Sequence, residues 1–357
     1  MTLRSEILAR FTGAGGSAPL FLPDLTLWHK WHRERGTLPA GWHDFTLPQA
    51  ARHLNAAIWA VARPWQATTP GITSRSEESA DERIIRHETP FGTLTTRFTR
   101  GPDGDWWLTE YPVKSGDDLA AARALVDART YKLDTSDLAE LRKAVGEDGV
   151  IALELPMRPY SDVLHAFLGW SEGLMLFAGD GRPALLEMLA ILEEKAQTLT
   201  EQVAALAGDL LLAPDNLDGQ YISPKIFRDQ FAGSYRRTAE SAHRYGKPLV
   251  VHVGGPIRRV LPLLAEAGVD GVEGIAGPPQ SDASLAEARQ LAGPGLTLWG
   301  GIPQDLLQDI HAQDVFEAGV AEAIRQANGD NRMILGVADR VPVDAEFARL
   351  QAIPGLV

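Results

Sequence analysis

A lone histidine interrupts the apolar run PLVVHVGG at residues 248–255, and its imidazole suits acid–base catalysis or metal binding. Two later runs of the same kind carry a carboxylate near their ends, Glu273 in GVDGVEG and Asp339 in MILGVAD. One imidazole and two carboxylates form a donor set that zinc, iron or manganese accepts. We therefore predict that His252, Glu273 and Asp339 hold a divalent metal ion, zinc or another. The alternative is that His252 only hydrogen-bonds a neighbouring carboxylate.

We predict catalytic roles for four residues: His252, Asp215, Glu273 and Asp339. His252 is expected to act as a metal ligand or as a general acid and base, with the carboxylates as co-ligands or orienting groups. Asp215 and Asn216 end the run DLLLAPDN. We expect Asp215 to point into the active site, while Asn216 shapes the loop or contacts the substrate.

Contacts with a small-molecule substrate are predicted for Asp24, Asn216, Arg158, Gly254, Gly255 and Trp299. Asp24 and Trp299 lie in the apolar runs APLFLPD and LTLWGGI. Arg158 follows the run GVIALELP and can clamp a substrate carboxylate or form a surface ion pair. Gly254 and Gly255 lack Cβ atoms, so they let the backbone approach a ligand or make a tight turn.

These residues lie in short apolar runs that we predict to be buried parallel strands, at 18–24, 149–156, 209–216, 248–255, 268–274, 296–302 and 333–339. Helix-length segments separate most of them; the one at 223–246 has Ser223 as its N-cap, Pro224 in its first turn and Gly246 at its end. The alternation predicts a (β/α)₈ TIM barrel whose active site lies at the C-terminal ends of the strands. An open doubly wound sheet is the alternative, but no G-x-G-x-x-G follows an early strand.

The segment 84–114 has a different pattern, since apolar and polar residues alternate on either side of the turn sequence GPDG. This predicts an antiparallel hairpin inserted in the N-terminal part of a single barrel domain that spans 1–357. The polar stretch 67–82 before it is expected to be a surface loop.

Composition excludes several classes of protein. The formal charge of −13 argues against binding to nucleic acid, which requires clustered Lys and Arg, and against adsorption to anionic membranes. The chain has no cysteine, so disulfides, thiolate ligands and a cysteine nucleophile are excluded. The N-terminus lacks a signal-peptide pattern and no apolar run approaches the roughly 20 residues that span a bilayer, so we expect a cytoplasmic protein.

Longer stretches resemble the uroporphyrinogen decarboxylase superfamily, which includes that decarboxylase and the methylcobalamin:thiol methyltransferases. The resemblance rests on PDNLDGQYISPKIFRDQF, HRYGKPLVVHVGGPIRRVLPLLAEAGVDGVEG, PPQSDASLAEARQLAG, LTLWGGIP and ILGVADRVPVD. TPFGTL at 89–94 and EYPVKSGDDL at 110–119 are similar to its methyltransferase-like branch. The resemblance implies a barrel enzyme of this branch.

Two motifs of the family are missing. Residues 1–35 lack the arginine-rich glycine motif with which the decarboxylases grip substrate carboxylates. The thiol-directed methyltransferases hold zinc with His-x-Cys and a distant second cysteine; here the first motif is His252, Val253, Gly254 and the second position falls near Ala338. Only the histidine is retained, and Glu273 and Asp339 are the residues that we infer to replace the sulfur ligands.

The leading functional hypothesis is a methyltransferase-like enzyme that transfers or removes a methyl group on a small organic substrate. The resemblance implies that a corrinoid, supplied by a separate corrinoid protein, takes part. One alternative is a metal-independent decarboxylase or lyase in which Asp24 or Asp215 stabilises a protonated intermediate. The other is a barrel that binds a small ligand without catalysis.

Overall fold

The computed structural model describes residues 1–357, which form two compact units. The first unit comprises Met1–Arg63, Thr135–Glu154 and Ala204–Val357. The second comprises Pro64–Asp134 and Leu155–Val203. No helix of the chain combines the length and the apolar character needed to cross a membrane.

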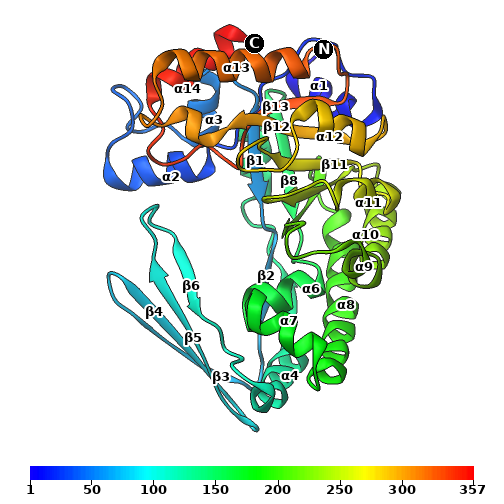
Figure 1. Cartoon of the computed structure of the whole chain (residues 1–357). Coiled ribbons are helices and arrows are strands. Elements are labelled where there is room, and N and C mark those ends of the chain that lie inside the picture. Colours follow the sequence, from blue (N-terminus) through cyan, green and yellow to red (C-terminus); the bar gives the residue numbers. More distant parts are fainter. The chain divides into compact units, whose positions relative to one another are not determined.

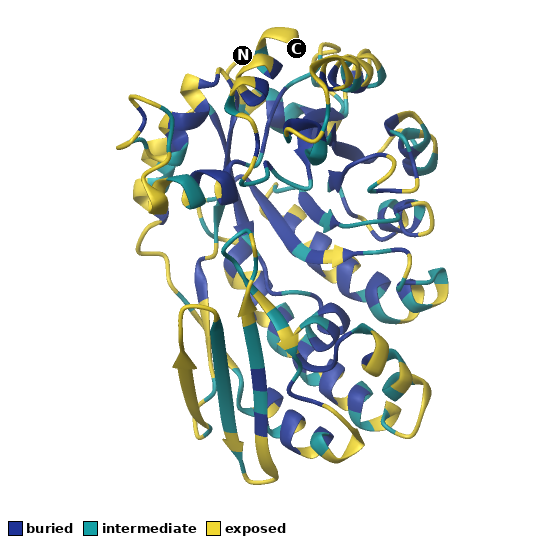
Figure 2. Ribbon diagram, turned by 60° about the vertical axis from the view of Figure 1, so that its left-hand side comes forward, coloured by how far each residue is buried: buried dark blue, intermediate teal, exposed yellow.

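The first unit is built on a curled, seven-stranded parallel sheet (Figure 1). Its strands, in spatial order, are β1 (Ile58–Ala62), β8 (Gly149–Glu154), β9 (Leu210–Leu217), β10 (Leu249–Val253), β11 (Gly271–Ile275), β12 (Thr297–Pro303) and β13 (Met333–Ala338). Six of the seven predicted strands are therefore confirmed. Most of these strand residues are buried, as expected where helices cover a parallel sheet (Figure 2).

The prediction of a strand at 18–24 is wrong, since only Phe21 forms an isolated bridge, with Leu335 of β13. The amide of Leu22 donates to the carbonyl of Leu335 at 2.8 Å, and the amide of Ala57 donates to the carbonyl of Phe21 at 3.2 Å. Pro19 and Pro23 limit the pairing because neither has an amide hydrogen to donate. Of the predicted eight-stranded barrel, the structure confirms a curled parallel sheet of seven strands.

Strand β1 was missed by the sequence reasoning. Its five residues IWAVA include two alanines, which have a low strand propensity, and the run is short. Its pairing with β8 and the burial of Ile58, Trp59 and Ala60 decide its structure.

Side chains near the starts of the strands form one apolar cluster with Ile7 and Phe11 of helix α1 (Leu3–Thr12). Trp299 of β12 belongs to this cluster and packs edge-on against Trp59, with the ring centroids 4.5 Å apart. Its indole nitrogen donates to the carbonyl of Leu22 at 3.0 Å. The core therefore fixes the early parts of the strands and leaves their C-terminal ends for the polar residues.

Helices of the first unit connect and flank these strands. They are α2 (Thr26–Arg35), α3 (Leu47–His53), α5 (Leu138–Val145), α9 (Pro224–Ile226), the π-helical turn η3 (Phe227–Phe231), α10 (Ala232–Arg244), α11 (Leu261–Glu266), α12 (Leu285–Ala292), the 3₁₀ turn η4 (Gln304–Leu307), α13 (Gln313–Ala327) and α14 (Phe347–Leu356). The predicted cap is confirmed, because the Ser223 hydroxyl accepts from the amide of Ile226 and Pro224 follows it. Gly246 has the expected positive φ of 66° just beyond α10.

The second unit contains a four-stranded antiparallel sheet made of β3 (Thr73–Glu78), β4 (Glu82–Thr89), β5 (Gly92–Arg100) and β6 (Trp106–Glu110). Strands β5 and β6 flank the GPDG turn, so the predicted hairpin is confirmed as part of a larger sheet. The prediction of a loop at 67–82 is wrong, because β3 forms within it as a fully exposed edge strand (Figure 2). Cross-strand ion pairs such as Arg86 with Glu77 stabilise this polar strand without any apolar burial.

The remaining elements of the second unit are two more strands, β2 (Trp65–Thr68) and β7 (Thr130–Leu133), and a set of helices. The helices are the short η1 (Gly116–Asp118), α4 (Leu119–Ala128), α6 (Pro159–Asp162), the π-helical η2 (Val163–Leu168), α7 (Trp170–Ala178) and α8 (Arg182–Ala204).

Candidate functional site

Three side chains meet near the C-terminal ends of the parallel strands of the first unit. His252 of β10 and Glu273 of β11 are register partners, and their side chains meet with Nδ1 and Oε2 2.6 Å apart. Asp339 directly follows β13, and its Oδ1 lies 3.3 Å from Nε2 of His252. The predicted ligand atoms all lie within 4.8 Å of one another. Residues more than 80 positions apart in the sequence are thus brought together by the order of the parallel strands.

Gly274 makes room for this arrangement. Its φ is 99°, and a Cβ atom there would overlap the carbonyl oxygen of Val253 and lie 3.1 Å from Cε1 of His252. The pairing of β11 with β12 shifts register between Glu273 and Ile275, so the strand is irregular at this glycine. The imidazole therefore packs against backbone that only glycine can provide.

Charge and burial act in opposite directions on the His252 pKa. Burial disfavours the charged imidazolium, but the carboxylates of Glu273 and Asp339 outweigh it and raise the pKa to about 9. Burial also raises the pKa of Glu273, with the His252 charge opposing it and the charges of Asp339 and Asp24 adding to it. The imidazole of His252 therefore stays protonated above neutral pH as long as no other cation neutralises the nearby carboxylates.

The two glycines after His252 serve the loop that follows β9. Asn216 has a left-handed φ of 46°, and its side-chain oxygen lies where a Cβ of Gly254 would be. Gly255 has a φ of 68°, and a Cβ there would crowd the carboxylate of Asp218. Both glycines thus permit close packing of this loop on the end of β10, which is the tight-turn interpretation of the pair.

Asp24 lies close enough to the cluster for its charge to raise the pKa of Glu273. Its Oδ1 accepts from the amide of Thr26 at 2.8 Å, which fixes the side chain at the start of α2. Asp24 is partly exposed, so it remains open to a substrate.

Three other predicted site residues lie outside the His252 cluster. Asp215 is fully buried and accepts a hydrogen bond of 2.6 Å from the hydroxyl of Tyr235 on α10. Trp299 is the register partner of Glu273, but its ring is buried in the core cluster. Arg158 belongs to the second unit, where its buried guanidinium donates to the carbonyl of Pro156 at 2.8 Å.

Two residues that bear on the site were missed by the sequence reasoning. The charge of Arg340 opposes protonation of His252, and its position directly after Asp339 was the available signal. Tyr235 carries no recognisable motif, because it lies in the helix segment AGSYRR and reaches Asp215 only through the fold.

The donor set of the cluster fits a divalent metal ion. One imidazole nitrogen and two carboxylate oxygens, from His252, Glu273 and Asp339, lie within 4.8 Å of one another, and all three are ligand types that such an ion accepts. In the absence of any thiolate, the set suits harder ions such as zinc, manganese or iron. Two carboxylates would also offset the charge of such an ion in this partly buried position.

The fold and these strand-end residues describe an α/β protein of the barrel type with a polar site at the mouth of the sheet. Residues 181–356 match the family model described as uroporphyrinogen decarboxylase (URO-D). The chain belongs to the uroporphyrinogen decarboxylase superfamily. Among curated protein sequences, none matches this chain.

Among solved structures, a methyltransferase from Methanosarcina mazei is similar over 100% of this chain and 98% of its own, with a TM-score of 0.62 and 15% identity. At that identity the likeness describes the fold. A D-psicose 3-epimerase from Clostridium cellulolyticum H10 matches 62% of this chain and 82% of its own, with a TM-score of 0.36 and 12% identity. That second similarity is too low to bear on function.

Proposed function

We propose that this chain is a methyltransferase-like enzyme that transfers or removes a methyl group on a small organic substrate with the help of a divalent metal ion. The observation that carries the proposal is the convergence of His252, Glu273 and Asp339, whose ligand atoms lie within 4.8 Å of one another. Membership of the superfamily and the fold shared with a methyltransferase support it.

Each residue of the site has a proposed role. His252, Glu273 and Asp339 would hold the ion, which would supply Lewis-acid activation of a bound substrate group. Asp24, whose charge acts on Glu273, would contact a basic or hydroxyl-bearing part of the substrate.

A corrinoid delivered by a separate protein is proposed as the methyl donor or acceptor, on the ground of the family resemblance. We assign no residue of this chain to the corrinoid. Binding of a purified corrinoid protein to this chain, measured by sedimentation velocity, tests the partnership.

A second candidate function is a metal-independent decarboxylase or lyase. It is favoured by the existing contacts of His252, which already has a carboxylate at each ring nitrogen and a pKa of about 9. In this version the imidazolium would deliver a proton to the carbon that loses carboxylate, and Asp24 would stabilise the protonated intermediate.

Metal analysis separates the two candidates. Protein purified and then equilibrated with zinc or manganese is expected to retain about one ion per chain, and His252→Ala, Glu273→Gln and Asp339→Asn to lose it. His243→Ala is the matched control, because His243 forms a similar 2.7 Å pair with Asp270 at the opposite end of β11. Full occupancy in His252→Ala would exclude the proposed site, whereas activity that survives complete chelation would favour the decarboxylase or lyase.

A further inference from the structure

A cavity of about 300 Å³ lies in the second unit, between the antiparallel sheet and the helices α4 and η2. Every residue that lines it belongs to this unit. Its volume is at the lower end of the range for small-molecule sites, which runs from roughly 300 to 1,000 Å³. None of the lining residues belongs to the His252 cluster, so a ligand bound here has a site of its own.

One wall of the cavity is a single face of the antiparallel sheet. Alternate residues of a strand point to the same face, which places Ile85 and His87 of β4 together. Cross-strand partners share that face, and Ile85 pairs with Thr96 while Phe98 pairs with Leu108. All five side chains line the cavity. The sheet therefore presents a mostly apolar wall that carries one imidazole.

The helical side of the cavity is also largely apolar. It includes Leu125 of α4 and the η2 residues Ala166 and Phe167. Arg129, just beyond α4, forms an ion pair with Asp162, and its guanidinium carbon lies 5.4 Å from the centre of the Phe167 ring. Aromatic and aliphatic side chains on both walls suit a ligand with a flat or hydrocarbon body.

The imidazole of His87 is available to such a ligand. Its Nδ1 lies 2.7 Å from the hydroxyl oxygen of Ser74. Its Nε2 is accessible and has no partner in the protein. With the serine hydroxyl donating to Nδ1, Nε2 carries the ring hydrogen and donates it, and in the imidazolium both nitrogens donate. The His87 ring therefore offers a donor to a ligand.

The ionisable side chains that line the cavity are all bases, namely His87, Arg129 and His165. Burial, and with it the charge of Arg129, lowers the pKa of His87, so the guanidinium acts on the imidazole. No carboxylate lines the cavity, although the whole chain has a formal charge of −13. A negative head group here meets donors and no like charge on the wall.

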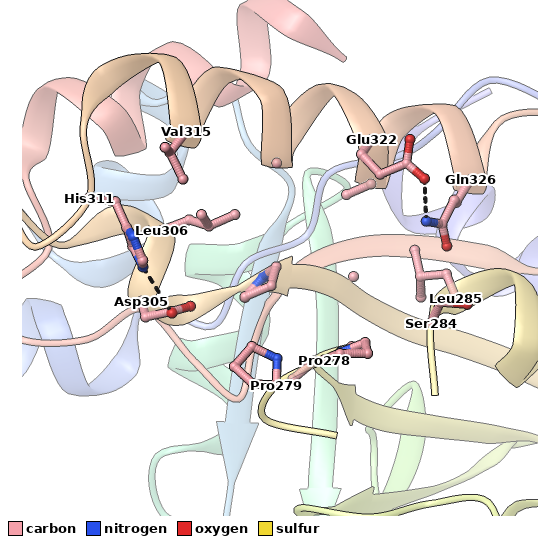
Figure 3. Close-up of a pocket in the computed structure, with 16 residues that line it drawn as sticks. Pro278, Pro279, Ser284, Leu285, Asp305, Leu306, His311, Val315, Glu322 and Gln326 are labelled. Atoms are coloured by element: carbon pink, nitrogen blue, oxygen red, sulfur yellow. Dashed lines mark hydrogen bonds and ion pairs between the residues drawn. The ribbon is translucent and has the colours of Figure 1, made fainter. Parts of the chain in front are cut away.

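A larger cavity in the first unit, of about 380 Å³, has the opposite character (Figure 3). Two carboxylates line it, and they pair with neighbouring side chains, Asp305 with His311 and Glu322 with Gln326. An anion in that cavity would meet like charges. The lining groups therefore favour an anion in the cavity of the second unit and disfavour it in that of the first.

We propose that the cavity of the second unit binds a small organic anion with an apolar body, such as an aromatic carboxylate. The carboxylate accepts a hydrogen bond from Nε2 of His87, and the ring packs against Phe98 and Phe167. A charge-assisted hydrogen bond is about twice as strong as a neutral one, so the anion binds more tightly than its neutral alcohol. This site is independent of the metal-assisted activity proposed above.

Benzoate is a suitable probe because its carboxylate is ionised at pH 7 and its ring matches the apolar walls. Isothermal titration calorimetry is expected to show saturable binding of benzoate, binding of benzyl alcohol that is at least roughly 10-fold weaker, and none of benzylamine. Absence of saturable binding up to about 10 mM benzoate, the weak end of specific recognition, would overturn the proposal. Benzylamine that binds as tightly as benzoate would also overturn it.

Variants test the contacts with the ligand. His87→Leu keeps an apolar side chain on the sheet and is expected to weaken benzoate binding at least about 10-fold. His43→Leu, which changes an exposed histidine of the first unit, is the control and should bind benzoate as the wild type does. Wild-type affinity in His87→Leu would contradict the assigned hydrogen bond.

A bulky side chain tests the cavity itself. Ala166→Trp fills it from an exposed lining position, so it should block binding while leaving the fold intact. Ala178→Trp introduces the same ring at an exposed position that does not line the cavity, and it should not change the affinity for benzoate. Unchanged affinity in Ala166→Trp would rule out this cavity as the binding site.

Two further variants separate this cavity from the other places where benzoate could bind. Val315→Trp narrows the first-unit cavity from a position that is 45% exposed, and His252→Ala removes the imidazole at the mouth of the parallel sheet. Both should bind benzoate with unchanged affinity. Loss of binding in either variant would place benzoate at that other site and overturn the assignment.

Discussion

His252 and Glu273 face each other as register partners on adjacent parallel strands, and their side chains meet at 2.6 Å. The strand pairing itself therefore produces the contact, without any loop to adjust it.

Glu273→Gln should lower the pKa of His252 in metal-free protein. Of the two carboxylate charges that raise the pKa of His252 to about 9, that of Glu273 is the larger contribution. Its removal should therefore lower the His252 pKa by at least about one unit. Titration of the His252 ring by heteronuclear NMR measures the change. A His252 pKa that stays near 9 in the variant would show that Glu273 does not stabilise the protonated imidazole.

Gly274→Ala should damage both stability and the site. The new Cβ would overlap the carbonyl of Val253 and crowd the His252 ring, at a φ of 99° that L-residues rarely adopt. Gly246→Ala is the matched control, because Gly246 also has a positive φ but nothing lies within 4 Å of its Cβ position.

We expect Gly246→Ala to cost about 1 kcal/mol of unfolding free energy, and Gly274→Ala about 2 kcal/mol more together with loss of metal. Urea unfolding measures both. Equal losses of unfolding free energy in the two variants would mean that the positive φ alone, and not the clash with Val253 and His252, destabilises Gly274→Ala.

Tyr235→Phe should lower the free energy of unfolding by about 1–3 kcal/mol, because it leaves the fully buried Asp215 without its tyrosine hydroxyl. Metal content should not change, since the cluster does not include Asp215. Metal loss in Tyr235→Phe or Asp215→Asn, with the fold retained, would instead support the catalytic role predicted for Asp215.

Stability should fall on acidification through the buried residue His29. Burial lowers its pKa below 6.5, while its Nε2 lies 2.8 Å from the carbonyl of Phe45. The unfolded chain therefore takes up the proton first, so the contribution of His29 is present above pH 6.5 and is lost as the pH falls through the folded value.

His29→Gln should reduce the slope of unfolding free energy against pH between about pH 7 and 5, measured by urea titration. His43→Gln, which changes an exposed histidine, is the control. A wild-type slope in His29→Gln would assign the acid sensitivity to another group.

The sequence predicted the His252 cluster because parallel strands carry their C-terminal residues to one edge of the sheet. It could not predict the face on which Asp215 lies. Ala213 pairs with Val251 and Leu217 with Val253, so β9 uses more residues than β10 over the same length. This irregularity, with Asn216 in the left-handed region, breaks the alternation on which the Asp215 prediction rested.

Trp299 shows a different limit. Its place on a buried strand was correctly predicted, but a strand pattern does not say whether a large ring reaches the mouth or packs in the core. The ring packs against Trp59, a residue on the strand that the sequence reasoning missed. The position of the Trp299 ring thus could not be predicted without recognising β1, which carries Trp59.

The bridge between Phe21 and Leu335 links residues near the two ends of the chain. During protein synthesis the segment around Phe21 is therefore without this partner until Leu335 has left the ribosome. Pairing over such a sequence separation is slow, and the waiting segment exposes apolar side chains such as Phe21 and Leu22 to other nascent chains. The sheet of the first unit thus cannot be completed before β13 has been synthesised.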